Sequence, residues 1–348
     1  MGATDISVIH PGDRAAQRQL DSLLSGAGIR RDANLDYTVG LFDDEGTLLA
    51  TGSAFANTLR CLAVSERHRG EGYLNQIVTF LIEEQTRRGF GEVFLYTKPE
   101  SARFFADLGF DEIERVPGYL VFMSNRPKAF TAYLNRLKRN ALVPGRACAV
   151  VMNANPFTLG HLHLLEMASR QSDVVHVFVV SEDASLFSFK DRFDLVRKGS
   201  AHLYKVMCHP TGSYMVSNAT FPSYFIKQAD DVTRVHALLD TLVFARIAST
   251  LGITRRFVGE EPFSGITRIY NQVMAEELPK HGIDLEVIPR CEYGKTPVSA
   301  SNVRQLIHDG HLDQVRPLVP RPTYEFLTSD EAGPTIDRIC RSEHVRHD

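Results

Sequence analysis

The chain has 348 residues, of which 43% are hydrophobic and 23% charged, and its formal net charge is −3. This length favours two domains over a single core, and the small net charge gives no support for binding to nucleic acid or to a membrane surface. The five cysteines include no C-x-x-C pair, which predicts reduced thiols and no metal site. We find no signal-peptide pattern and no apolar run long enough to span a bilayer, so we expect a cytoplasmic protein.

Residues 1–125 have the pattern of an α+β domain. Apolar runs at 37–42 and 48–52 flank the turn 43–46, which predicts a hairpin. From Tyr73 onward, apolar residues recur at helical spacing until about Gly89. The other elements predicted in this domain are strands at 59–64, 92–96 and 119–123 and a helix at 100–108. We therefore expect a mostly antiparallel sheet with helices.

The segment Arg67-His68-Arg69-Gly70-Glu71-Gly72 lies between a predicted strand and the helix that starts at Tyr73. Successive backbone amides in such a turn form an anion-binding nest, and the helix dipole behind them also favours a pyrophosphate. Arg67, Arg69, Gly70 and Gly72 are the candidate binding residues. A tight turn without a working site is the alternative, because such turns need glycine anyway.

Residues 126–145 are predicted to link two domains. No acidic residue occurs between Val116 and Leu165, and we expect a helix at 129–140 that is closed by Pro144-Gly145. The basic residues of this stretch are Arg126, Lys128, Arg136, Lys138, Arg139 and Arg146. They form either a solvated connecting helix or a basic patch that meets ATP or an acidic carrier protein.

Residues 146–348 alternate between strand and helix patterns. Apolar runs at 148–152, 174–180, 256–258 and 285–288 are separated by helical patterns such as 160–169 and 232–251. This alternation predicts a Rossmann-like, doubly wound parallel sheet.

The first of these strands is followed by the turn that carries the clearest chemical signal in the chain. The turn contains Asn153, Asn155 and Phe157, and Gly160-His161 opens a helix. Backbone amides, a helix N-terminus and an imidazole at the carboxyl edge of a sheet can hold the phosphates of ATP and stabilise charge on the α-phosphate. We prefer His161 over His163, because residues two apart cannot both face the phosphates on a helix of 3.6 residues per turn. Thr158 offers a hydroxyl on the same side.

A second motif near the other end of the chain includes Ser299, Ser301 and Arg304. Ser299 or Ser301 is expected to cap a helix that Gly310 ends, and Arg304 would project from its first turn in position to grip a phosphate. Lys190 and Arg192, in a predicted loop after 187–189, are either further phosphate ligands or solvated side chains.

Together the two motifs, Asn-Pro-Phe-Thr-x-Gly-His at 155–161 and Val-Ser-x-Ser-x-Val-Arg at 298–304, resemble those of the nucleotidylyltransferase superfamily. The resemblance implies that His161 stabilises the α-phosphoryl transition state, with Thr158 standing where other members have a first histidine. It also implies that Ser299, Ser301 and Arg304 hold the β- and γ-phosphates. The segment 258–263, which includes Gly259 and Glu261, would lie near the adenosine.

The Arg-x-x-Gly-x-Gly turn at 67–72, with the strands and helices around it, resembles the GNAT acetyltransferase fold, whose equivalent turn binds the pyrophosphate of coenzyme A. The two domains in this order, with the segments 217–222 and 261–264, resemble the citrate lyase ligase family. That family activates acetate with ATP, which implies Mg²⁺ as well, and acetylates the prosthetic-group thiol on the acyl-carrier subunit of citrate lyase. A CoA-like moiety could then bind the first domain.

Three alternatives to this family function share some of the same motifs. The first is an adenylyltransferase that acts on a phosphopantetheine-like cofactor. The second is a CoA-sensing regulator with vestigial catalytic motifs, and the third is a CoA-dependent N-acetyltransferase.

Overall fold

A computed structural model describes residues 4–140, 145–215, 220–224, 226, 229–260, 265–294, 296–342 and 345. The chain forms two compact units. Unit 1 contains Met1–Ala132 together with Pro222–Val235, and unit 2 contains Tyr133–Phe221 together with His236–Asp348. A segment from the second half of the chain, Pro222–Val235, thus belongs to unit 1. The domain boundaries predicted at 125 and 146 assign this segment to the second domain. None of the described helices is both long and apolar enough to cross a bilayer.

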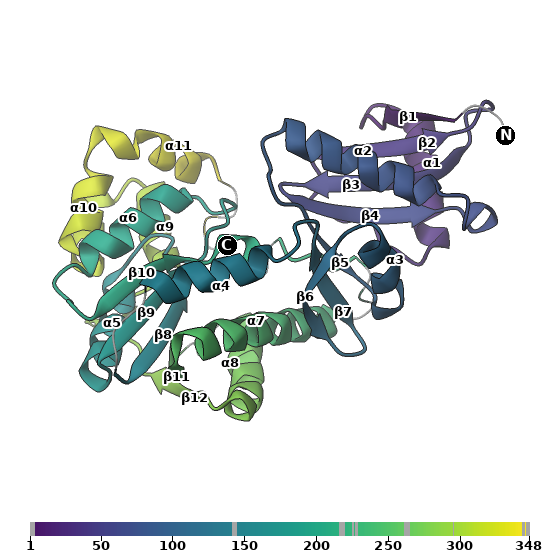
Figure 1. Cartoon of the computed structure of the whole chain (residues 1–348). Coiled ribbons are helices and arrows are strands. Elements are labelled where there is room, and N and C mark those ends of the chain that lie inside the picture. The colour runs from purple at the N-terminus through teal and green to yellow at the C-terminus, as the bar shows by residue number, and fades with distance from the viewer. Residues whose placement is uncertain are drawn as a thin grey trace. The chain divides into compact units, whose positions relative to one another are not determined.

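Unit 1 is built around a seven-stranded sheet with the strand order β1-β2-β3-β4-β5-β7-β6 (Figure 1). Neighbouring strands are antiparallel except β4 and β5, which pair in parallel through Thr58–Phe94 and Leu59–Leu95. The elements are β1 (Asp5–Val8), α1 (Arg14–Gly26), β2 (Tyr37–Phe42), β3 (Leu48–Phe55), β4 (Thr58–Val64), η1 (Glu66–His68), α2 (Tyr73–Arg87), β5 (Phe94–Thr97), η2 (Pro99–Ser101), α3 (Ala102–Asp107), β6 (Asp111–Val116) and β7 (Leu120–Ser124).

The core of unit 1 comes from alternating strand residues and from the apolar stripes of the helices. Ile77, Val78 and Leu81 of α2 pack against strand residues such as Val39 and Leu95. A second cluster contains Leu20 and Leu24 of α1 together with residues of β3 and β4. The α+β domain with a mostly antiparallel sheet is therefore confirmed.

Unit 2 contains a five-stranded parallel sheet with the order β10-β9-β8-β11-β12, in which the central strand, β8, is the first of the five in sequence and pairs with the fourth, β11. This is a doubly wound order, and the point where it reverses lies between β8 and β11. The elements from the linker onward are α4 (Ala129–Asn140), β8 (Ala147–Met152), α5 (Leu159–Gln171), β9 (Val174–Val179), α6 (Phe189–Gly199), β10 (Val206–Pro210), η3 (Gly212–Tyr214), α7 (Ala229–Leu251), β11 (Ile253–Gly259), α8 (Gly265–Glu277), η4 (Leu278–His281), β12 (Asp284–Ile288), β13 (Glu292–Tyr293), β14 (Thr296–Pro297), α9 (Ala300–His308), η5 (Leu312–Leu318), α10 (Arg321–Leu327), η6 (Asp330–Ala332) and α11 (Gly333–Arg341).

One hydrophobic cluster of unit 2 lies on one face of its sheet. Val150, Val177 and Phe257 point into this cluster, which also contains Leu165 of α5 and Val303 of α9. The opposite face is more polar, because it buries His176, His209 and Arg256. The Rossmann-like parallel sheet predicted for the second half of the chain is confirmed.

Candidate functional site

A cavity of about 490 Å³ lies where the carboxyl ends of β8 and β11 meet the N-termini of α5 and α9. This volume is in the range of small-molecule and cofactor sites. The lining includes most of the residues predicted for the nucleotide site, namely Asn153, Asn155, Thr158, Gly160, His161, Gly259, Ser299, Ser301 and Arg304. The turn after β8 and the helix near the C-terminus are thus brought to one cavity.

The first turn of α5 fixes the orientation of His161. Thr158 is the N-cap residue, and its backbone N–H donates to Nδ1 of His161 at 3.1 Å. Its hydroxyl oxygen lies 2.9 Å from the same nitrogen and accepts from the His161 backbone N–H at 3.4 Å. Because a backbone N–H can only donate, Nδ1 is an acceptor and the neutral imidazole carries its proton on Nε2. The ring therefore has an Nε2–H donor for a ligand in the cavity.

Burial keeps this imidazole neutral. His161 stacks on Phe157 with ring centroids 5.8 Å apart, and loss of solvation lowers the pKa of His161 to about 4. At neutral pH the ring is thus a hydrogen-bond donor without a positive charge. The positive field in this part of the cavity comes instead from the N-terminus of α5.

Gly160 brings the two sequence motifs into contact. A Cβ at this position would lie 3.0 Å from the carbonyl oxygen of Val298, which precedes the Ser299 cap of α9. Because the two backbones approach so closely, a residue with a side chain would not fit easily at position 160. The same close approach places the N-termini of α5 and α9 at one cavity. Anions are favoured at such a place by the unpaired N–H groups of both helices.

Ser299 caps α9 as predicted, since its hydroxyl accepts from the Asn302 backbone N–H at 3.2 Å. The Ser301 hydroxyl lies 3.2 Å from that of Ser299. Arg304 is only 4% exposed, and it donates to the carbonyl oxygens of Asn155 and Val345 at 2.6 and 2.8 Å. Arg304 therefore ties α9 to the turn after β8, in addition to lining the cavity.

The turn after β8 is held by Arg192 of α6, which is fully buried. Its guanidinium donates to the backbone oxygen of Asn153 and to the Asn153 side chain at 2.9 and 2.8 Å, and it also bonds the carbonyls of Val180 and Phe187. From the sequence, Arg192 is expected in a loop, either as a solvated residue or as a phosphate ligand. Both interpretations are wrong, because α6 begins at Phe189 and Arg192 is a buried support of the cavity wall.

The cavity is not lined by every residue predicted for it. Phe157 is fully buried, and its ring fits against Gly199, where a Cβ would lie 2.6 Å from it. Lys190 is in the first turn of α6 and does not line the cavity. Glu261 is outside the described residues, as are the segments 217–219 and 261–264.

Several polar residues that were not selected from the sequence also line the cavity, among them Arg290, Thr267 and His163. Arg290, after β12, donates to the carbonyl oxygen of Glu260 at 2.9 Å. Thr267 lies in the first turn of α8, and His163 lies two residues after His161. Both histidines thus line the cavity, and the preference for His161 over His163 as the one that faces the phosphates stays a prediction. Arg290 could have been found as a basic residue after a predicted strand.

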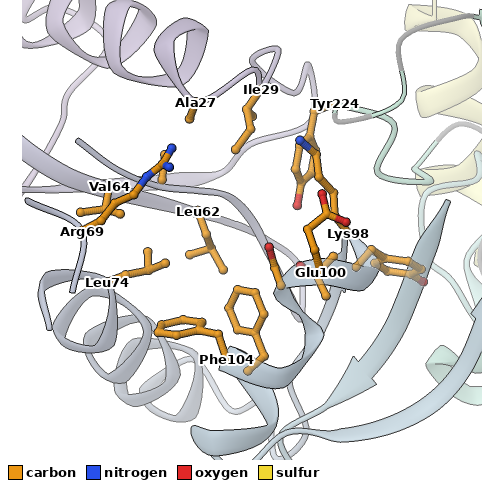
Figure 2. A pocket seen from close by; sticks show the side chains of 15 residues that line it. Ala27, Ile29, Leu62, Val64, Arg69, Leu74, Lys98, Glu100, Phe104 and Tyr224 are labelled. Atoms are coloured by element: carbon orange, nitrogen blue, oxygen red, sulfur yellow. The ribbon is translucent and has the colours of Figure 1, made fainter. Parts of the chain in front are cut away.

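Unit 1 contains a separate cavity, also of about 490 Å³, between the diverging ends of β4 and β5 (Figure 2). Arg69 lies on one side of it and Lys98, Glu100 and Tyr224 on the other, with Leu62 and Phe104 between them. Tyr224 belongs to the segment that returns from unit 2. The middle of this cavity is therefore apolar, and its two sides are polar.

The turn predicted to bind a pyrophosphate lies next to this cavity. Gly70 and Gly72 have φ values of +88° and +79°, which L side chains rarely adopt. Gly72 is the N-cap of α2 and supplies no side-chain cap, so the first N–H groups of the helix remain available. Arg69 lines the cavity, whereas Arg67 is exposed and does not.

Comparison with known proteins gives a consistent result over nearly the whole chain. The family model described as "Citrate lyase ligase C-terminal domain" matches residues 147–327. The citrate (pro-3S)-lyase ligase of Escherichia coli K12 is 38% identical over 305 residues, which cover 85% of this chain and 87% of that protein. The enzyme of the same name from Klebsiella pneumoniae is 38% identical over 338 residues, covering 95% and 96%.

Among solved structures, an acetyltransferase of the GNAT family from Staphylococcus aureus Mu50 matches this chain with 13% sequence identity and a TM-score of 0.30. The match covers 35% of this chain and 98% of that protein's chain. The citrate lyase ligases, in contrast, match both units and their order. On the strength of these relatives and of the family model, the chain belongs to the citrate lyase ligase family.

Proposed function

We propose that this chain activates acetate with ATP to form acetyl-AMP, and then acetylates the prosthetic-group thiol on the acyl-carrier subunit of citrate lyase. The observation that carries the proposal is the convergence of His161 and the Ser299–Arg304 motif on one cavity in a chain that belongs to a ligase family. The alternatives raised from the sequence are not favoured, because the full-length relatives are ligases.

In the first half-reaction an oxygen of acetate attacks the α-phosphorus of ATP, the bond to the β-phosphate oxygen breaks, and pyrophosphate leaves. The Nε2–H of His161 and the N-terminal amides of α5 would stabilise the charge on the α-phosphate. Ser299, Ser301 and Arg304 would orient the β- and γ-phosphates. Mg²⁺ would neutralise these phosphates, and ATP itself would supply many of its ligands. The described residues include no group of three His, Cys, Asp or Glu that could hold a metal ion.

In the second half-reaction the carrier thiol loses its proton to solvent, its sulfur attacks the acyl carbon of acetyl-AMP, and AMP leaves. We propose that the unit 1 cavity binds the CoA-like arm of the prosthetic group. The N-terminus of α2 and Arg69 would take its pyrophosphate, and Leu62 and Phe104 would contact the less polar part of the arm.

The first test is pyrophosphate exchange into ATP, measured with and without acetate. We expect exchange to require acetate, and His161→Ala to lower its kcat by about 10²- to 10³-fold, as for the loss of other transition-state donors. Exchange that is independent of acetate, or that requires a phosphate-bearing acceptor, would refute the ligase proposal.

The unit 1 proposal is tested with a bulky side chain at the α2 turn. Gly72→Trp should abolish acetylation of the carrier subunit and leave acetate-dependent exchange intact, because only the second half-reaction needs the arm. Gly46→Trp is the matched control, since Gly46 also has a positive φ and open space around it but lies in the β2–β3 hairpin. Loss of both activities in the Gly72 variant, or of neither, would contradict this role.

A further inference from the structure

Arg256 of β11 is a buried cation, two of whose three guanidinium nitrogens have no hydrogen-bond partner among the described residues. Its side chain lies on the polar face of the unit 2 sheet and is 7% exposed. Neither Nε nor Nη1 has a partner among the residues that the structure describes. Burying charged donors without hydrogen bonds costs several kcal/mol, so such groups are normally paired or bind a ligand.

The surroundings of Arg256 are aromatic and acidic. Its guanidinium carbon lies 4.4 Å from the centre of the Phe244 ring, and Asp240 of α7 and Tyr270 of α8 are its electrostatic neighbours. His236 of α7 contacts the Tyr270 hydroxyl through Nδ1, and its Nε2 lies 3.7 Å from Asp240 Oδ2. We call these five residues the Arg256 cluster.

Asp240 does not balance the charge of Arg256. Burial raises the pKa of Asp240 to about 8, and the neighbouring carboxylate of Glu182 adds to the rise although Arg256 opposes it. Asp240 is therefore largely protonated at neutral pH. Burial also lowers the pKa of Arg256, to about 10, which still leaves the guanidinium charged. Within the Arg256 cluster the guanidinium thus has no ionised partner, while the Glu182 carboxylate, which is not one of the five residues, acts on Asp240.

The Arg256 cluster adjoins the nucleotide cavity through two elements. Arg256 precedes Gly259 by three residues in β11, and Gly259 lines that cavity. Tyr270 follows Thr267 by three residues in α8, which is about one helical turn, and Thr267 also lines it. Three residues of a strand span about 10 Å, so the backbone of Arg256 lies within about that distance of the cavity lining at Gly259.

We propose that Arg256 binds the carboxylate of the acid substrate, an inference that rests on the proposed function. A monocarboxylate would accept from the unpaired N–H groups of Arg256 and from the protonated carboxyl of Asp240. The rings of Phe244 and Tyr270 would contact a short alkyl group. A phosphate dianion fits less well, because its second charge would face Glu182. The site thus selects a small carboxylic acid.

The decisive experiment compares steady-state constants for acetate-dependent pyrophosphate exchange. Arg256→Gln should raise the KM for acetate by about 10- to 100-fold, the range expected for losing a charged hydrogen bond, and should change the KM for ATP by no more than about 2-fold. Arg255→Gln is the matched control, because Arg255 is the preceding residue in β11 but bonds Ser172 Oγ instead. A folded Arg256→Gln enzyme with an unchanged KM for acetate would overturn the inference.

A second measurement covers the case in which Arg256→Gln does not fold. Sodium acetate, compared with sodium chloride at equal ionic strength, should raise the Tm of the unaltered protein. Asp240→Asn should keep the Tm that the unaltered protein has without acetate. A large loss of Tm in Asp240→Asn would instead identify Asp240 as the counter-ion of Arg256 and refute the inference. The proposed function fails separately, if the unaltered enzyme shows no acetate-dependent exchange.

Discussion

Thr158 shows how a single residue sets the chemistry of a neighbour. Through its backbone N–H and its hydroxyl it holds Nδ1 of His161, and this leaves the ring proton on Nε2. From the sequence, we expect the Thr158 hydroxyl to lie on the same side of the helix as His161 and to be available to the phosphates. The structure adds a supporting role, because the Thr158 hydroxyl is turned toward His161 and the residue as a whole is only 1% exposed.

Thr158→Ala should therefore lower the kcat of acetate-dependent exchange by up to about 10-fold, the equivalent of one neutral hydrogen bond. It should also destabilise the protein by about 1 kcal/mol through loss of the α5 cap. Thr158→Ser keeps the hydroxyl and should retain both properties. Normal kcat in a destabilised alanine variant would show that the hydroxyl only caps the helix. Exchange assays and urea unfolding measure the two effects.

At this scale the sequence predicted the residues of two short motifs and missed those whose roles depend on tertiary contacts. Ser299, Gly160 and His161 could be selected because a cap, a close approach and an imidazole have local signatures. Arg192 could not be interpreted correctly, because its partners Asn153 and Val180 come from two other loops. Arg256 gave no signal at all, since an arginine within a short apolar run does not reveal which face it occupies.

The strand pair β9–β10 carries a pH-sensitive element. His176 Nδ1 and His209 Nε2 lie 3.0 Å apart in the interior, and burial lowers the pKa of each to about 4, helped in His209 by the charge of His176. An unfolded histidine titrates near 6.5. Between pH 6.5 and 4 the unfolded chain thus binds more protons than the folded protein, and stability falls as the pH is lowered through this window.

We expect the free energy of unfolding to fall between pH 7 and pH 5 by about 2 kcal/mol for each of these histidines. Urea denaturation at a series of pH values measures the slope. A variant with valine at both positions, which suits a strand, should lose most of it. If the slope persists in that variant, other groups are responsible for it.

Elements with strong periodicity were predicted well, and those with weak or short patterns were not. The helix α4 (Ala129–Asn140) and the strand β9 were expected within a residue or two of their observed bounds. The segment of α6 is predicted as a loop from the sequence but forms a helix, because the polar residues that interrupt its apolar stripe hide the helical period. No prediction covered α1, although Asp13 caps it and Leu20 and Leu24 lie on one face. Strand order depends on long-range pairing, which a single sequence does not reveal.

For the whole molecule, the main departure from the sequence-based division is that unit 1 is discontinuous. Tyr224 is 7% exposed and packs in the cluster of Leu20, Leu24 and Leu48. Arg30 holds the same segment, donating to the carbonyls of Ser223 and Ile226 at 3.1 Å. Composition could place a boundary near the basic linker, but it could not indicate that the chain returns.

A fragment of residues 1–145 should therefore be less stable than unit 1 in the whole protein. The expected loss is about 3–5 kcal/mol, the usual cost of deleting a large buried aromatic side chain. Thermal unfolding of the fragment, followed with and without a synthetic peptide of residues 220–235, measures it. Tyr224→Ala in the full chain is the control for the side chain alone. A fragment as stable as the intact unit would show that the returning segment contributes nothing.

The return of the chain at 222–235 also bears on how the protein is made. On the ribosome, the N-terminal domain of a protein usually folds first, as translation adds about 5–20 residues per second. Here the first unit must wait for a segment that emerges after β8, β9 and β10 have been synthesised. That delay is on the order of ten seconds, during which the surface that Tyr224 later covers is open. Folding during synthesis therefore cannot be strictly sequential for this chain.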